Sequence, residues 1–401
     1  MQAEALNLLT RTMEAQLLRK SQPEGYPYLP PVPSSRYTDP GFAGLERDGM
    51  WMKTWLLAGH ISELPTGGSY FLFEQLDQSV IISRGKDGAI RAFYNACRHR
   101  GSALLLQQSG KAARFVCPYH SWGYSLEGDL KSVPDQHDFQ CLDKADSGLI
   151  PVRCDVSRGF IYINFDQQAG PLEDFLAPQL PQTEGYPIDK MVVKHRLLVE
   201  MECNWKIAYH NFCEIYHVST CHPKTLSPYL DSQSFVIALL ANGHMRFATR
   251  KKKGDSIFGH DLYKPDDIAD IFREVTVALP SFPNVFYSLD PIGFNLQSFW
   301  PAGPNKSVME VRMMGWDVDT EADRTHWESM KGLVGHILDE DLHLFGSMQR
   351  NLAQGIIPEL VLGYQERALY WFEEEIDRRI GVDNIPETQR VAQVLSGQMQ
   401  R

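Results

Sequence analysis

Two short segments, CRHRGSALL at residues 97–105 and CPYHSWGY at residues 117–124, decide how the first half of this chain folds. Each segment carries one cysteine and one histidine, in a C-x-H pattern in the first and a C-x-x-H pattern in the second. Thiolates and imidazoles at such close spacing are typical ligands of zinc and of iron–sulfur clusters. We therefore expect the two segments to approach each other and to hold a metal centre.

The order of the four ligands distinguishes zinc from a two-iron cluster. Structural zinc sites usually place their two cysteines together and their two histidines together. Here Cys97 precedes His99 and Cys117 precedes His120, so each segment supplies one of each. That order suits a Rieske [2Fe-2S] cluster, in which two cysteines bind one iron and two histidines bind the other. Zinc stays the alternative, and a colourless protein that carries zinc would support it.

Short strand patterns surround these segments. Residues 79–85 and 89–97 flank the sequence Lys86-Asp87-Gly88, which is a good hairpin turn. We interpret residues 41–166 as a small, all-β Rieske domain. The preceding residues 1–40 predict an amphipathic helix followed by a linker rich in proline.

The pattern changes after residue 166. Strand-like runs such as KHRLLVEMEC (194–203) and SVMEVRMMGW (307–316) are interspersed with helical patterns, including a long one over residues 325–352. This mixture favours an antiparallel sheet with helices packed on it, so we predict a catalytic domain over residues 167–401. The fold class of the whole chain is expected to be α+β.

Composition excludes several classes of protein. The chain has 401 residues, enough for two domains, and a net charge of −11, which argues against nucleic-acid binding. It has no run of eighteen apolar residues and no signal-peptide pattern at its start, so we expect no membrane association. The seven cysteines are an odd number, which fits a reducing cytoplasm.

A second set of possible ligands lies in NWKIAYHNFCEIYHVSTCHP, residues 204–223. On a straight helix, its residues His210, Glu214, His217 and Cys221 fall on one face. That face carries most of the metal-binding side chains of the segment. It therefore predicts a metal site, although a helix with incidental histidines is the plainer interpretation.

Two more side chains can complete this second site. His222 is followed by Pro223, so we expect the helix to end there and to bring His222 toward His217. The long helix at 325–352 then offers Asp341, because two histidines and one carboxylate form the usual ligand set of non-heme iron(II).

Asp341 is chosen by its place on the long helix. It falls within an apolar stripe, where a carboxylate is costly unless it meets a cation. Asp339 and Glu340 lie off the stripe and are expected to face solvent. The apolar members of the stripe are Met330, Val334, Ile337, Phe345, Met348 and Leu352.

The motifs C-x-H-R-G, C-x-x-H-x-W, N-W-K, E-x-Y-H-x4-H and E-D-L follow one another along this chain. In this order they resemble the α subunits of the Rieske non-heme iron oxygenases of the aromatic-ring-hydroxylating type, over nearly the whole chain. The resemblance implies a [2Fe-2S] cluster on Cys97, Cys117, His99 and His120, and a mononuclear Fe(II) on His217, His222 and Asp341.

The resemblance also gives Glu214 a catalytic role. In the family an acidic residue at this position bridges an iron histidine, here His217, and a cluster histidine of a neighbouring subunit, here His120. A head-to-tail homotrimer brings those groups together. Most relatives have aspartate at the bridge, and the glutamate here resembles the carnitine and glycine betaine oxygenases. The unusual His210 is a candidate for a supporting group or a proton carrier.

These implications define the expected function. The chain would be the oxygenase component of a multicomponent system, a mono- or dioxygenase that uses O2 to hydroxylate or demethylate a small organic substrate. A quaternary amine and an aromatic or alicyclic acid are both open as substrates. Electrons would come from an NAD(P)H-dependent flavin and iron–sulfur reductase or a ferredoxin, since this chain has no Rossmann glycine fingerprint. The alternative is a Rieske electron-transfer protein with a vestigial second metal site.

The substrate pocket is the least determined part. We expect its lining from residues 208–213, 235–250 and 284–300, although aromatic residues there can equally be core. The aromatic candidates are Phe212, Phe247, Phe286, Phe294, Phe299 and Trp300.

Overall fold

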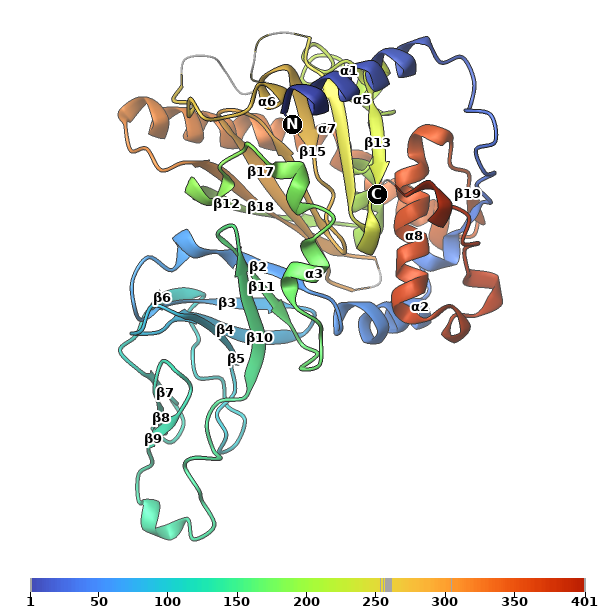
Figure 1. Cartoon of the computed structure of the whole chain (residues 1–401). Coiled ribbons are helices and arrows are strands. Elements are labelled where there is room, and N and C mark those ends of the chain that lie inside the picture. Colours follow the sequence, from blue (N-terminus) through green and yellow to red (C-terminus); the bar gives the residue numbers. More distant parts are fainter. Residues whose placement is uncertain (1, 253, 255, 257–261, 304, 400–401) are drawn as a thin grey trace. The chain divides into compact units, whose positions relative to one another are not determined.

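The structure is a computed structural model that describes residues 2–252, 254, 256, 262–303 and 305–399 (Figure 1). The chain forms two compact units. One of them is Met52–Asp174, and the other combines Met1–Trp51 with Phe175–Arg401. The first unit is built from strands, and the second from an antiparallel sheet with helices, so the predicted α+β class is confirmed.

The unit of residues 52–174 contains two antiparallel sheets. The predicted hairpin is present, with Arg84 paired to Ile90 and Gly88 in the turn at a φ of 83°. The larger sheet has the strand order β2-β11-β10-β5-β4-β3-β6, and the smaller has the order β7-β8-β9. The strands are β2 Leu56–His60, β3 Ser69–Gln75, β4 Gln78–Arg84, β5 Ile90–Tyr94, β6 Ser109–Lys111, β7 Phe115–Val116, β8 Gly123–Tyr124, β9 Leu130–Ser132, β10 Pro151–Ser157 and β11 Phe160–Asn164.

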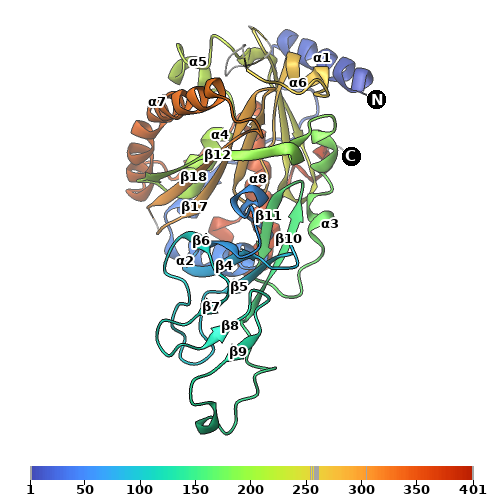
Figure 2. The same cartoon turned by 90° about the vertical axis from the view of Figure 1, so that its left-hand side faces the viewer.

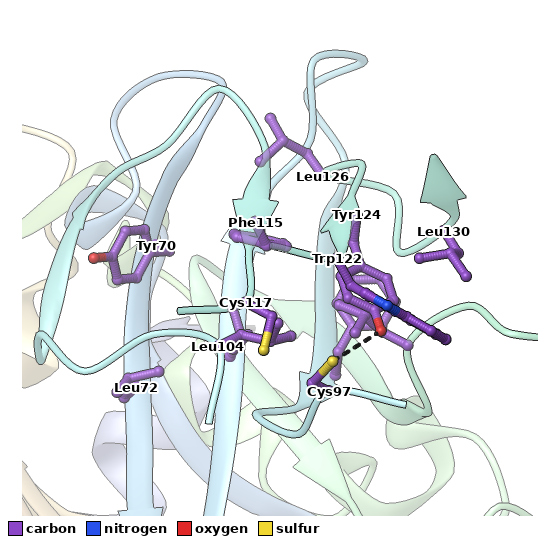
Figure 3. Packing of buried hydrophobic residues seen from close by; sticks show 13 residues of the cluster. Tyr70, Leu72, Cys97, Leu104, Phe115, Cys117, Trp122, Tyr124, Leu126 and Leu130 are labelled. Atoms are coloured by element: carbon purple, nitrogen blue, oxygen red, sulfur yellow. Dashed lines mark hydrogen bonds between the residues drawn. The ribbon is translucent and has the colours of Figure 1, made fainter. Parts of the chain in front are cut away.

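The core of this unit contains both cysteines of the ligand segments. Cys97 is 3% exposed and Cys117 is 2% exposed, and both pack among aromatic and aliphatic side chains (Figure 3). The neighbours drawn there include Leu104, Phe115 and Trp122. The two segments thus meet inside the unit, as the sequence predicts.

The other unit is organised around a seven-stranded antiparallel sheet with the order β12-β18-β17-β16-β15-β14-β13. Its strands are β12 Met191–Met201, β13 Val236–Leu239, β14 Met245–Arg250, β15 Val275–Ala278, β16 Val285–Leu289, β17 Gly293–Pro301 and β18 Ser307–Trp316. The α-helices of the chain are α1 Gln2–Leu18, α2 Pro40–Glu46, α3 Leu172–Leu176, α4 Trp205–Phe212, α5 Val218–Cys221, α6 Asp270–Glu274, α7 Glu321–Ala353 and α8 Arg367–Ile380. None of the described helices is both long enough and apolar enough to cross a bilayer.

Helix α7 lies alongside β12, β17 and β18 (Figure 2). It begins where the Thr320 side chain accepts a hydrogen bond from the Asp323 amide, which satisfies a free donor of the first turn. Its buried face differs by one position from the predicted stripe, because Leu338 is buried while Met348 is 45% exposed. The buried side chains are Trp327, Met330, Val334, Leu338, Asp341, Phe345, Gln349 and Leu352.

The N-terminal segment folds with the unit of residues 175–401. Strand β1 (Val32–Pro33) pairs with β19 (Glu359–Leu360), and the buried Arg36 pairs with Glu373. Residues 41–51, which the sequence analysis placed in the small β domain, also belong here. Their burial partners are distant in sequence, since Trp51 packs edge-on against Trp205 at a ring-centroid distance of 4.8 Å.

Candidate metal centres

The two cysteine–histidine segments form matching tight loops. The Gly101 amide donates a hydrogen bond to the carbonyl oxygen of Cys97 (2.9 Å), and the Ser121 amide donates to that of Cys117 (3.0 Å). Both closing residues have left-handed backbones, with φ at 75° for Gly101 and 59° for Ser121. Glycine adopts that conformation without strain, whereas serine does so at some cost. The loops therefore present Cys97 and Cys117 in equivalent ways.

The two sulfur atoms lie in a buried setting with polar partners. The Tyr124 hydroxyl lies 3.4 Å from Cys97 Sγ and accepts a hydrogen bond from the Arg98 amide (Figure 3). Burial raises the pKa of the Cys97 thiol. Burial also opposes ionisation of Cys117, but the backbone N–H groups of Tyr119 and His120 outweigh it and lower the pKa of that thiol. Donors aimed at sulfur suit bound thiolates.

The two histidines of these loops lie beside each other, with ring centroids 4.7 Å apart. His99 stacks on Trp122 at 4.9 Å with nearly parallel rings, and His120 packs against Tyr119. His99 Nδ1 is buried and has no hydrogen-bond partner among the described residues. A buried ring nitrogen without a partner, next to a second imidazole and near two thiols, fits the donor set of a Rieske cluster.

The predicted continuous helix over the second set of ligands is wrong. Helix α4 ends at Phe212, and the Glu214 carboxylate then accepts hydrogen bonds from the amides of Tyr216 and His217. A side chain that binds the backbone ahead of it competes with helical hydrogen bonds, and the chain turns here. Consequently His210 and Cys221 do not share a helix face with Glu214 and His217, and only the last two are brought together.

The break in the helix brings three expected ligands to one place. Single ligand atoms of His217, His222 and Asp341 all lie within 4.8 Å of one another. The Nε2 atoms of His222 and His217 are 3.1 Å and 3.9 Å from Asp341 Oδ1. That oxygen is buried and accepts no hydrogen bond of normal geometry from any described residue. Two imidazoles and an unsatisfied carboxylate oxygen fit a two-histidine, one-carboxylate iron site.

Each of these histidines is also held by a second carboxylate. His217 Nδ1 contacts Glu214, and His222 Nδ1 lies 2.6 Å from Glu340 Oε2. Glu340 also accepts from Thr225, so the prediction that Glu340 faces solvent is wrong. Carboxylates on Nδ1 leave Nε2 free for a metal and fix the orientation of the ring. The neighbouring Asp339 is exposed, as predicted.

The pKa of His222 depends on its two neighbouring carboxylates, Asp341 and Glu340. Burial favours the neutral imidazole, but the negative charges of Asp341 and Glu340 outweigh it and raise the pKa of His222. A divalent cation between His222 and Asp341 would replace that proton.

A cavity of about 180 Å³ opens beside these ligands. It takes side chains from the three predicted segments, including Phe212, Phe247 and Phe286. Phe235 also lines it, although it was not among the aromatic candidates. Three other candidates are core residues that do not line the cavity: Phe294, Phe299 and Trp300.

His210 lies away from this cavity. Its Nδ1 is 3.4 Å from the Tyr37 hydroxyl, and its Nε2 is 3.7 Å from Glu373 Oε1. Burial lowers the pKa of His210 to about 4. His210 therefore belongs to the buried polar group that ties the N-terminal segment to α8.

Comparisons with known proteins match both parts of the chain to known domains. Residues 54–143 match the Rieske [2Fe-2S] domain, and residues 188–382 match the ring hydroxylating alpha subunit (catalytic domain). The glycine betaine monooxygenase oxygenase subunit of Chromohalobacter salexigens is 34% identical over 200 residues, which are 50% of this chain and 45% of that protein. The carnitine monooxygenase oxygenase subunit of Acinetobacter baumannii is 35% identical over 195 residues, 48% of this chain and 52% of that protein.

The matched region spans about half the length of these curated relatives. Two solved structures share the fold over a greater length. A quaternary ammonium Rieske monooxygenase has a TM-score of 0.78 at 22% identity, covering 90% of this chain and 99% of that one. A naphthalene 1,2-dioxygenase from Rhodococcus sp. bound to indole has a TM-score of 0.77 at 22% identity, covering 94% and 99%.

Proposed function

This chain combines a Rieske [2Fe-2S] domain with the catalytic domain of a ring-hydroxylating alpha subunit, and we propose that it is the oxygenase component of a multicomponent Rieske oxygenase. The reaction is the hydroxylation of a small organic substrate by O2, or its demethylation when the hydroxylated carbon is attached to nitrogen or oxygen. The convergence of His217, His222 and Asp341 beside a cavity is the observation that carries this proposal.

The ligands divide between two metal groups. Cys97 and Cys117 would hold one iron of the cluster, with His99 and His120 on the other, and the three converging residues would hold Fe(II). When bound, the cluster supplies single electrons and the mononuclear iron supplies the activation of O2.

Protein side chains supply position and a water-poor setting. Glu214 and Glu340 orient the imidazoles of His217 and His222, while Asp341 supplies negative charge from α7. The cavity lining next to them is mainly apolar, so substrate would displace water from the site when it binds.

Electron transfer would pass between subunits of a homotrimer. The route runs from His120 of the partner subunit through Glu214 to His217. Two features support Glu214 as the bridge: it holds His217 Nδ1, and besides the cavity next to the metal ligands it lines a second pocket, which also includes Met348.

Reducing power would come from an NAD(P)H-dependent reductase or a ferredoxin. A cytoplasmic location is proposed as well, because none of the seven cysteines forms a disulfide.

The first experiment is anaerobic purification, followed by iron and sulfide analysis and EPR of the reduced protein. We expect a Rieske signal and about three irons per chain, two of them in the cluster. The Asp341→Ala variant should keep the Rieske signal and lose the third iron. If the Rieske signal is present but Asp341→Ala does not change the iron content, the second metal site is contradicted. The chain would then be an electron-transfer protein.

A further inference from the structure

One wall of the cavity is the face of the central sheet. Thr249 on β14 pairs directly with Thr276 on β15, and Phe286 on β16 pairs with Gln297 on β17. Directly opposed residues of antiparallel strands present their side chains on the same face. All four line the cavity, with the small Ala278 among them. The wall is therefore a mixed surface in which neutral polar groups are set among phenyl rings.

One of these polar groups has no hydrogen-bond partner in the described part of the chain. Thr276 Oγ1 is buried and makes no hydrogen bond with any described residue. Gln297 is 6% exposed, and its side chain lines the same cavity. In contrast, the Thr249 hydroxyl donates to the Asp231 carbonyl at 2.7 Å. Buried polar groups are normally satisfied, so the unpaired hydroxyl of Thr276 indicates a ligand that binds it, and the amide of Gln297 lies in the same cavity wall.

The charges of the cavity disfavour a substrate that carries a negative charge. No lysine or arginine is found among its described lining residues. The two carboxylates that line it, Glu214 and Asp341, already interact with the histidines His217 and His222. Asp341 and Glu214 balance the charge of the proposed iron, so a substrate carboxylate would have no further cationic partner among the described lining residues, and a buried carboxylate without one is strongly disfavoured. A betaine or an acid would have to bury its carboxylate in that setting.

The size and the apolar lining of the cavity indicate how large the substrate is. A dry cavity of roughly 150 Å³ holds one benzene ring, and this one measures about 180 Å³. Its phenyl rings form two pairs, Phe212 with Phe286 at 5.5 Å and Phe235 with Phe247 at 5.1 Å. The space fits a single ring with one small substituent.

From these observations we infer that the substrate is an uncharged, one-ring-sized molecule whose neutral hydrogen-bonding group contacts Thr276 and Gln297. This inference rests on the proposed oxygenase function and narrows its substrate. It excludes quaternary amines and acids, which the sequence alone leaves open as substrates. Thr276 and Gln297 would determine which substrate is bound. They are not among the iron ligands.

The test uses three ring compounds that differ only in their substituent: benzamide, benzoate and benzene. Their affinities are measured by anaerobic equilibrium dialysis on protein that has first shown a Rieske signal and a full iron content. We expect benzamide to bind at least about tenfold more tightly than benzoate, because only the acid must bury a charge. Loss of iron or of the Rieske signal at the first step would contradict the oxygenase proposal itself, independently of ligand preference.

Matched variants test whether Thr276 and Gln297 cause the preference for benzamide. Thr276→Val and Gln297→Leu should each weaken benzamide by about threefold to tenfold and leave benzene unchanged, as expected for one lost hydrogen bond. Thr249→Val is the control, since its hydroxyl is already engaged, and it should leave the benzamide-to-benzene ratio as it is.

Several results would overturn the inference. Benzoate, carnitine or benzyltrimethylammonium binding as tightly as benzamide would show that a charged substrate is accepted. Failure of both neutral compounds to bind iron-loaded protein would contradict the size argument. A benzamide affinity that neither Thr276→Val nor Gln297→Leu alters would remove the two residues from substrate recognition.

Discussion

Glu340 Oε2 lies 2.6 Å from Nδ1 of His222. The next residue along α7, Asp341, approaches Nε2 of the same ring at 3.1 Å. Two consecutive carboxylates thus take the two nitrogens of one imidazole. One can serve as the metal ligand and the other as the group that orients the ring.

Replacing Glu340 by glutamine should weaken the mononuclear iron. The variant keeps the size of the side chain but loses the charge that orients His222, and losses of this kind typically cost roughly 10- to 100-fold in metal affinity. Chelator competition measures the affinity, while the Rieske EPR signal should be unchanged. Asp339→Asn is the control, because Asp339 is an exposed neighbour on the same helix. Equal affinities in both variants would contradict the orienting role.

Replacing Tyr124 by phenylalanine should lower the reduction potential of the cluster. The Tyr124 hydroxyl lies 3.4 Å from Cys97 Sγ, and a donor to sulfur stabilises the more negative, reduced state. A hydrogen bond worth about 1 kcal/mol corresponds to about 40 mV for a one-electron couple. Redox titration followed by EPR measures the shift. Tyr94→Phe is a control within the same unit. An unchanged potential in Tyr124→Phe would show that the Tyr124 hydroxyl does not donate to the cluster thiolate.

Glu373 should contribute stability that depends on pH. Burial opposes its ionisation, but Arg36 and Lys206 outweigh burial and lower the pKa of Glu373 from 4.5 to about 2. A carboxylate with a lowered pKa in the folded state stabilises the protein above its ordinary pKa, and that contribution is lost as the pH falls from about 4.5 to 2.

The variant Glu373→Gln tests this expectation. It should destabilise the unit by about 3 to 5 kcal/mol at neutral pH, since it removes one partner from a buried ion pair. Calorimetry of both proteins across acid pH should show the difference shrinking toward pH 2. A difference that stays constant over that range would contradict the ionised state of Glu373.

A methyl group at position 315 should disturb the packing of α7. A Cβ added to Gly315 would lie 2.5 Å from Cζ2 of Trp327, a contact that real side chains do not make. We expect Gly315→Ala to destabilise the protein by about 1 to 3 kcal/mol and to weaken iron binding, because Trp327 and Asp341 share this helix. Thermal unfolding and iron content measure the two effects. Gly332→Ala is the control: no atom lies within 4 Å of its added Cβ, so it should be neutral or slightly stabilising.

The features that the sequence predicted best depend on local spacing. The hairpin around Gly88, the meeting of the two cysteine segments and the burial of Asp341 all follow from short patterns. The convergence of His217 and His222 with Asp341 was predicted from Pro223, from the apolar stripe around Asp341 and from the family resemblance, and single ligand atoms of the three residues lie within 4.8 Å of one another. Their role as iron ligands stays a prediction until the metal is measured.

The errors have a common physical cause, which is competition from contacts that periodicity does not register. Helix α4 stops because the Glu214 side chain binds the amides ahead of it. Glu340 points toward the site and not into solvent, because its carboxylate contacts Nδ1 of His222, 118 positions earlier in the chain. Arg36, which lies in the predicted linker, is buried because its partners lie on α8. In each case the deciding partner is a specific side chain or a residue far along the chain, so no local pattern records it.

The ion pair between Arg36 and Glu373 also has a consequence for biosynthesis. Arg36 is translated 337 residues ahead of its partner. At roughly 5 to 20 residues per second, the ribosome needs about 17 to 67 seconds to cover that interval. The unit of residues 52–174 is complete long before then and can fold while its flanking N-terminal segment still waits for α8. Nascent chains of this protein therefore pass through a stage in which Arg36 and Trp51 are available to chaperones.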